Sequence, residues 1–188
     1  MQVPLIELDL RLPLDRLRFD RVLFLDIDGV LHPDGAGSHA DFCCLPLFVE
    51  ALQDADPRGE LPIVVSSAWR HTQRLDVIRG HFPAAIRPQI VGVTPFLADA
   101  HADSIGSSSA GVAGAVADRY PRQAEIALWI WRNAPIARWL AVDDRASGFV
   151  DRCPDLFLVP GPTGEGGGPG ITAVVAAALR QRLQQFLQ

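Results

Sequence analysis

The sequence predicts a doubly wound α/β fold, and two observations lead to that prediction. Five short apolar segments recur along the chain, and amphipathic segments of helical length lie between most of them. The apolar segments are nearly continuous rather than alternating, which is typical of strands buried on both faces of a parallel sheet. Strands that alternate with helices predict right-handed crossovers and a Rossmann-like three-layer sandwich around a mainly parallel five-stranded sheet.

The elements follow in order along the chain. Strands are expected at residues 22–26, 62–66, 89–93, 139–143 and 155–159. Helices are expected at residues 45–55, 72–81, 122–133 and 171–187. Two segments fit neither pattern: residues 98–117 are rich in Ala, Ser and Gly and are read as a loop, a weak helix or a small lid, and residues 161–170 are read as a flexible loop.

Length and composition indicate one soluble domain. The chain has 188 residues, of which 48% are hydrophobic, so we expect a single domain over residues 1–188 with a core from about residue 20. No apolar run approaches the roughly 20 residues of a membrane span, and the N-terminus is neither a signal peptide nor a transit peptide, so we expect a cytoplasmic protein without a membrane partner.

Cys43, Cys44 and Cys153 are expected to be reduced thiols.

The charge of the chain limits its partners. A net charge of −5 argues against stable coating of nucleic acid, which needs a basic surface, but it allows a local basic site. All 17 basic residues are arginine, so any fixed cation in a site must be an arginine.

Acidic and hydroxyl side chains lie at the ends of three predicted strands. The first strand ends at Asp26 with Asp28 just beyond, the second at Ser66 and Ser67, and the fourth at Asp143 and Asp144. Because the carboxyl ends of parallel strands meet at one edge of a sheet, these groups should lie together. Four carboxylates at one place repel one another, and a hard divalent cation with oxygen ligands, such as Mg²⁺, resolves that repulsion.

This set of groups suits phosphoryl transfer. Asp26 is placed to attack phosphorus and form an aspartyl phosphate. Asp28, two residues on, is placed to protonate the leaving oxygen and then to deprotonate the attacking water. Gly29 permits a sharp turn and leaves main-chain N–H groups free for phosphate oxygens.

The same residues resemble a known family. LDIDGVL at residues 25–31 resembles the first motif of the haloacid dehalogenase (HAD) superfamily, IVVSS at 63–67 its second motif, and WLAVDD at 139–144 its fourth. The third motif is a basic residue before the fourth strand, for which Arg122 is best placed and Arg119 is the alternative. The combination is similar to the small HAD domains found alone and in Swiss Army Knife RNA-repair proteins.

The resemblance implies a HAD-like fold and a role for each motif residue. Asp26 would be the nucleophile and a Mg²⁺ ligand, and Asp28 the general acid and base, with its main-chain carbonyl on the metal. Ser66, or Ser67 as the alternative, would hold a phosphoryl oxygen, and Arg122 would offset negative charge. Asp143 and Asp144 would complete the metal site, directly or through water.

The spaces between the motifs are too short for a cap domain, and caps in this family cover the site. We therefore expect a capless domain, or one with a minimal lid within residues 94–120. By analogy with the family, an open site suits a bulky substrate such as a nucleic-acid end or a protein.

The segment after the second predicted strand is a candidate substrate site. Arg70, with His71 and Arg74, would bind a second phosphate or a polynucleotide backbone. Trp69 is expected to pack in the core, with stacking on a base as the alternative. The histidines form no ligand pattern and are all expected to be non-catalytic: His32, His39, His71, His81 and His101.

The leading hypothesis is a Mg²⁺-dependent phosphatase acting on a phosphomonoester, either a small molecule such as a nucleotide or a nucleic-acid end. The alternative is a catalytically silent HAD-fold domain that binds a nucleotide or a protein partner. A receiver-type phosphoacceptor is disfavoured because it needs a lysine, and the chain has none. The sequence leaves the substrate and the oligomeric state open.

Overall fold

The computed structural model describes residues 19–35, 41–97, 118–134 and 137–188. Its strands are β1 (Arg21–Leu25), β2 (Ile63–Val65), β3 (Ile90–Val93), β4 (Arg138–Asp143) and β5 (Leu156–Leu158). Its α-helices are α1 (Leu45–Ala55), α2 (Leu75–Gly80), α5 (Pro121–Asn133) and α6 (Ala173–Leu187). Two short 3₁₀ helices are η2 (Ala68–His71) and η3 (Arg87–Gln89).

The five strands form one parallel sheet in the order β3-β2-β1-β4-β5. The chain runs outward from β1 to β3 and then returns to β4 on the other side of β1. The order therefore reverses between β1 and β4, and a crevice at the carboxyl ends of the strands opens at such a switch point. The predicted doubly wound sheet is confirmed.

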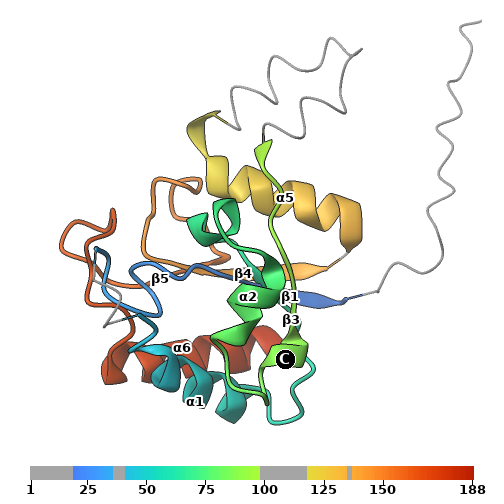
Figure 1. The fold of residues 1–188 in the computed structure, drawn as a ribbon. Coiled ribbons are helices and arrows are strands. Elements are labelled where there is room, and N and C mark those ends of the chain that lie inside the picture. Colours follow the sequence, from blue (N-terminus) through green and yellow to red (C-terminus); the bar gives the residue numbers. More distant parts are fainter. Residues whose placement is uncertain (1–18, 36–40, 98–117, 135–136) are drawn as a thin grey trace, which may run out of the picture.

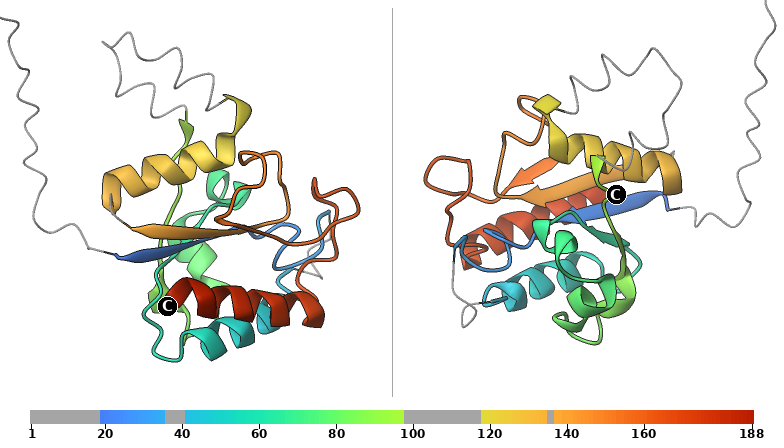
Figure 2. Two further views of the ribbon diagram at one scale, coloured as in Figure 1. Left: turned by 180° about the vertical axis from the view of Figure 1, so that it is seen from behind. Right: turned by 45° about the horizontal axis from the view of Figure 1, so that its top comes forward.

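Helices cover both faces of the sheet, as Figures 1 and 2 show: α5 lies on one face, and α1 and α6 lie on the other. Alternating side chains of β1 supply the two cores. Leu23 and Leu25 are buried in the cluster beneath α1 and α6. Phe24 is buried in the cluster beneath α5, where its ring meets the edge of Trp129 at 5.6 Å between centroids.

Local sequence signals explain where several helices begin. Pro121 occupies the first turn of α5, where its missing N–H costs nothing. The Thr172 hydroxyl accepts a hydrogen bond from the Val175 N–H and caps α6. The Ser67 hydroxyl accepts one from the Trp69 N–H and caps η2.

The element predictions are confirmed in kind, with one boundary corrected. The helix expected at residues 72–81 is shorter: η2 precedes it, Arg74 has an extended backbone, and α2 begins only at Leu75. Residues 98–117 lie outside the described residues, so the lid predicted within 94–120 stays a prediction. The three cysteines are free thiols, as expected.

None of the helices within the described ranges is long and apolar enough to cross a membrane.

Candidate active site

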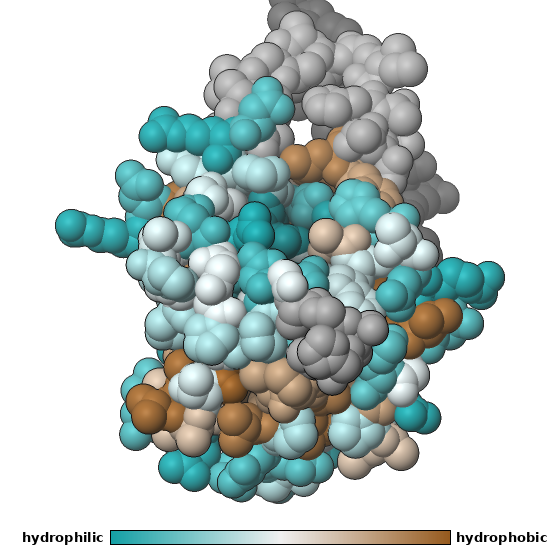
Figure 3. Space-filling model, turned by 60° about the vertical axis from the view of Figure 1, so that its left-hand side comes forward, coloured by the Kyte–Doolittle hydropathy of each residue, from teal (hydrophilic) through white to brown (hydrophobic). Residues whose placement is uncertain are grey.

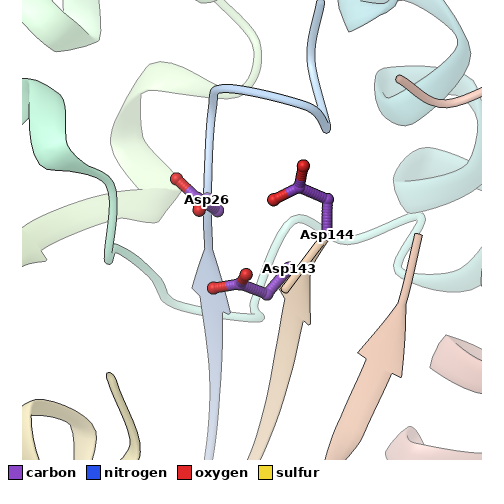
Figure 4. Close-up of side chains that lie close together, drawn as sticks. All are labelled: Asp26, Asp143 and Asp144. Carbon is purple, nitrogen blue, oxygen red and sulfur yellow. The ribbon is translucent and has the colours of Figure 1, made fainter. Parts of the chain in front are cut away.

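Three buried aspartates meet where the strand order reverses. Asp26 follows β1, Asp143 is the last residue of β4, and Asp144 comes next. Each carries a carboxylate oxygen within 4.8 Å of an oxygen on the other two. All three residues are at most 4% exposed, and Figure 4 shows their side chains gathered at the tips of two neighbouring strands. The predicted clustering of these acids is thus observed.

Burial without a cation makes these carboxylates hard to ionise. Burial, then the charge of Asp26, raises the pKa of Asp143 to about 8. The same two causes raise the pKa of Asp144 to about 6. Burial also raises the pKa of Asp26, although the positive charge of Arg122 opposes the shift. The carboxylate form therefore needs more positive charge than Arg122 supplies.

The free oxygens of the cluster fit a metal ion. Asp144 Oδ2 is buried and has no hydrogen-bond partner among the described residues. Asp143 Oδ2 likewise makes no well-aligned hydrogen bond there, although Arg122 Nε lies 3.2 Å away. Three buried carboxylates, two of which keep an oxygen without a hydrogen bond, are a donor set for a hard cation such as Mg²⁺. The residues present therefore fit the ion that the sequence predicts.

Arg122, in the first turn of α5, links two of the acids. Its Nη2 lies 3.2 Å from Asp26 Oδ2, and its Nε lies 3.2 Å from Asp143 Oδ2. Burial alone would lower the pKa of Arg122, but Asp26, Asp143 and Glu125 together raise it, so its charge is held. Arg119, the alternative from the sequence, is exposed and lies over the Tyr120 ring instead.

Gly29 is required by the shape of the site. Its φ of 69° lies in the left-handed region, which favours glycine. A Cβ at this position would overlap the carboxylate of Asp144. The turn after β1 can thus pass directly over the acid cluster.

The two candidate serines differ in their partners. The Ser66 hydroxyl is buried and has no hydrogen-bond partner among the described residues. The Ser67 hydroxyl caps η2, and its hydrogen bond to Asp26 helps to hold down the pKa of that carboxyl. Ser67 is thus the hydroxyl in contact with Asp26, and which of the two serines holds a phosphoryl oxygen stays a prediction.

The side chain of Asp28 lies apart from the metal cluster. Its Oδ1 accepts hydrogen bonds from His32 Nε2 and from Trp69 Nε1, each at 3.0 Å. The Asp28 carboxylate is therefore held by side chains rather than by the other acids. The expected contact of its main-chain carbonyl with the metal stays a prediction.

Arg70, which the sequence predicts as a substrate-binding residue, is buried in an ion pair. Its side chain is 3% exposed, pairs with Glu125, and donates to the Ser67 main-chain carbonyl at 2.6 Å. Arg74 is exposed and pairs with Asp76. Contact of Arg70 with a substrate stays a prediction, and its visible role is to tie the loop after β2 to α5.

A cavity of about 460 Å³ opens beside the acids, lined by His71, Arg122, Asp143, Arg145 and other residues. Figure 3 shows that the middle of this face is hydrophilic and hollowed, with hydrophobic residues across its lower part. Arg145 Nη2 pairs with Asp34 Oδ2 at 3.0 Å at the rim. The cavity thus reaches Asp143 and Arg122 of the cluster.

Three residues make contacts at the site that the sequence does not predict. Trp69 packs against the core beneath α1 and α6, as expected, and its indole N–H also donates to Asp28. His32 bonds to Asp28, Glu125 pairs with Arg70, and the expectation that His32 is non-catalytic stays a prediction. The spacing of His32 four residues after Asp28 is a local signal that pointed to their contact. Trp69 and Glu125 gave no such signal, because their partners lie 41 and 55 residues away.

This chain is similar to a solved structure and to a protein family. A crystal structure of a candidate HAD-like phosphatase from Mesorhizobium loti aligns with a TM-score of 0.42 and 17% identity, over 90% of this chain and 88% of that chain. Similarity at that level carries no argument about function. No curated protein matches the sequence. Residues 22–163 match the family model of the HAD domain in Swiss Army Knife RNA repair proteins, and the chain therefore belongs to that family.

Proposed function

We propose that this domain is a Mg²⁺-dependent phosphatase that hydrolyses a phosphomonoester through an aspartyl phosphate on Asp26. Family membership supports a phosphatase-type activity. The observation that carries the finer proposal is the group of three buried aspartates beside Arg122, in which Asp143 and Asp144 each keep an oxygen without a hydrogen bond. Asp26, Asp143 and Asp144 would hold the ion, which when bound supplies positive charge to offset the carboxylates and the transferring phosphoryl group.

In the first half-reaction an oxygen of Asp26 bonds to phosphorus while the bond to the leaving oxygen breaks. Arg122 offsets the charge of Asp26, and the Ser66 hydroxyl donates to a phosphoryl oxygen. The proton of Asp28 passes to the leaving oxygen, which departs as an alcohol.

In the second half-reaction water attacks the phosphorus of the aspartyl phosphate. Asp28, now a carboxylate, takes a proton from that water, and the bond from phosphorus to Asp26 breaks. Inorganic phosphate leaves, and both aspartates return to their starting states.

The substrate is a phosphomonoester that reaches the hollow beside Arg122. A nucleotide or a nucleic-acid end is the class to test first, since the family takes its name from RNA repair proteins. The exposed ring of His71, 4.3 Å from the Phe96 ring between centroids, offers an aromatic surface at the cavity.

Hydrolysis of p-nitrophenyl phosphate tests the proposal directly. We expect turnover with Mg²⁺, none with EDTA, and none with Asp26→Asn. A panel of nucleotides and of 3′- and 5′-phosphorylated oligonucleotides then addresses the substrate class.

Thermal stabilisation by Mg²⁺ with beryllium fluoride, a mimic of aspartyl phosphate, is the second readout. Stabilisation that Asp26→Asn abolishes supports an intact site even where p-nitrophenyl phosphate is a poor substrate. If the protein shows no turnover and no stabilisation, the results would favour a catalytically silent domain that binds a nucleotide or protein partner.

A further inference from the structure

The carboxylate of Asp28 is held in an asymmetric way. Two ring N–H groups, from His32 and Trp69, both point to Oδ1 at 3.0 Å. No side chain among the described residues hydrogen-bonds Oδ2, and the Asp28 side chain is 39% exposed. One oxygen is therefore anchored, and the other is left without a side-chain partner on a partly exposed side chain.

The hydrogen-bond partners of His32 determine which ring nitrogen carries the hydrogen. His32 is 3% exposed, and its Nδ1 accepts a hydrogen bond from the Phe42 N–H at 3.3 Å. A neutral imidazole that accepts at Nδ1 must carry its hydrogen on Nε2, which faces Asp28. The main chain of Phe42 thus orients the donor that holds the acid.

The backbone of Phe42 is strained in the position that makes this contact. Its φ of 58° lies in the left-handed region, which a bulky residue rarely adopts. Its ring stacks on His81 at 4.5 Å and meets the edge of Trp69 at 5.2 Å between centroids. Strain kept by surrounding contacts is frequent where a residue must be held for function.

We infer that His32 and Trp69 are positioning residues that hold Asp28 so that Oδ2 exchanges protons with the leaving group and the attacking water. The inference rests on the proposed phosphatase function and assigns a task to two residues outside the metal cluster. Neither residue touches the phosphoryl group, and both act through Asp28.

The leaving group offers a specific readout of this role. Phenolate is a poor leaving group, so phenyl phosphate needs the proton of Asp28 when its P–O bond breaks. Dinitrophenolate is stable and leaves without a proton, so 2,4-dinitrophenyl phosphate does not need it. Loss of Asp28 positioning should therefore slow the first substrate far more than the second.

The experiment compares kcat/KM for the two substrates in variants of the full chain with saturating Mg²⁺. His32→Leu replaces the hydrogen-bond donor with an apolar side chain. Trp69→Phe removes the indole N–H and keeps an aromatic ring. We expect each to lower kcat/KM for phenyl phosphate at least about tenfold more than for 2,4-dinitrophenyl phosphate. His32→Gln, which places an amide N–H near the former Nε2, should restore much of the loss.

His81→Leu is the matched control, because His81 packs on Phe42 and Trp69 in the same aromatic cluster without bonding to Asp28. It should change both substrates equally. Equal losses for both substrates in His32→Leu and Trp69→Phe, or no loss, would overturn the inference and leave the phosphatase proposal intact. A wild-type protein that hydrolyses neither substrate would overturn the phosphatase proposal and this inference with it.

Discussion

Two buried acidic regions of this domain have opposite surroundings. At the amino-terminal side of the sheet, Asp56 is 9% exposed and its carboxylate accepts hydrogen bonds from the Glu60 and Leu61 N–H groups and from Gln89 Nε2. At the carboxyl ends of the strands, Asp143 and Asp144 are each 1% exposed and retain unsatisfied oxygens.

The comparison separates a structural acid from a functional one. A buried carboxylate that is fully hydrogen-bonded to the protein contributes to folding and has no oxygen left for a ligand. A buried carboxylate with unsatisfied oxygens costs stability unless a ligand occupies the site. The contrast can be tested by changing one region at a time.

Asp143→Asn should have the largest effect of these changes, and the property that it changes should be catalytic activity. Loss of one metal ligand and its charge should lower Mg²⁺-dependent turnover on the order of a hundredfold or more. It should also remove the Mg²⁺-induced rise in melting temperature. Assays of p-nitrophenyl phosphate hydrolysis and thermal melts with and without Mg²⁺ check both points. Retention of the full Mg²⁺ response would contradict the assignment of Asp143 as a metal ligand.

Asp56→Ala should act on stability alone. Removing the acceptor leaves two main-chain N–H groups without their partner and takes from the Gln89 amide one of its two hydrogen bonds, so we expect a loss of about 3 kcal/mol in the free energy of unfolding. Urea denaturation measures that loss. The Mg²⁺-induced stabilisation should match that of the wild type, and a reduced response would mean that the two regions are coupled.

Gly29→Ala connects backbone conformation with the metal site. A left-handed backbone costs a non-glycine residue about 1–2 kcal/mol, and the new Cβ would displace Asp144. We expect a loss of that size by urea denaturation, together with weaker Mg²⁺ binding by calorimetry. Gly35→Ala is a suitable control, because Gly35 has a similar φ and open space around its Cβ position. Equal Mg²⁺ binding in both variants would argue against the overlap with Asp144.

The stability of the protein should also depend gradually on pH. The pKa of Asp143 is raised to about 8 by burial and by Asp26, so between about pH 4 and pH 8 the folded metal-free protein keeps a proton that the unfolded chain has lost. Its free energy of unfolding should fall as pH rises through this window, by at most about 1.4 kcal/mol per pH unit for one proton.

Denaturation in EDTA at several pH values measures this slope, and Asp143→Asn should flatten it. Excess Mg²⁺ should oppose the fall, because the ion competes with the proton for the carboxylate. A wild type and variant with parallel pH profiles would show that Asp143 does not carry the raised pKa.

Much of the fold and part of the site follow from local sequence patterns. Residues 22–25 are apolar and Asp26 follows them, and this is enough to predict β1 and to place an acid at its end. The same holds for β4 and Asp143. Parallel strands with acids at their carboxyl ends bring those acids together, so the cluster of Asp26, Asp143 and Asp144 could be anticipated.

The rest depends on contacts between residues far apart in the chain. No local pattern shows that Trp69 reaches Asp28, that Glu125 neutralises Arg70, or that Arg122 rather than Arg119 bridges the acids. The physical reason is the distance along the chain over which each feature is determined. Strand and helix patterns come from neighbouring residues in the sequence. Side-chain partners depend on how α5, η2 and the turn after β1 pack against one another. The sequence by itself determines which acids lie at the strand ends. Their protonation and their hydrogen-bond partners are decided by burial and packing in the tertiary structure.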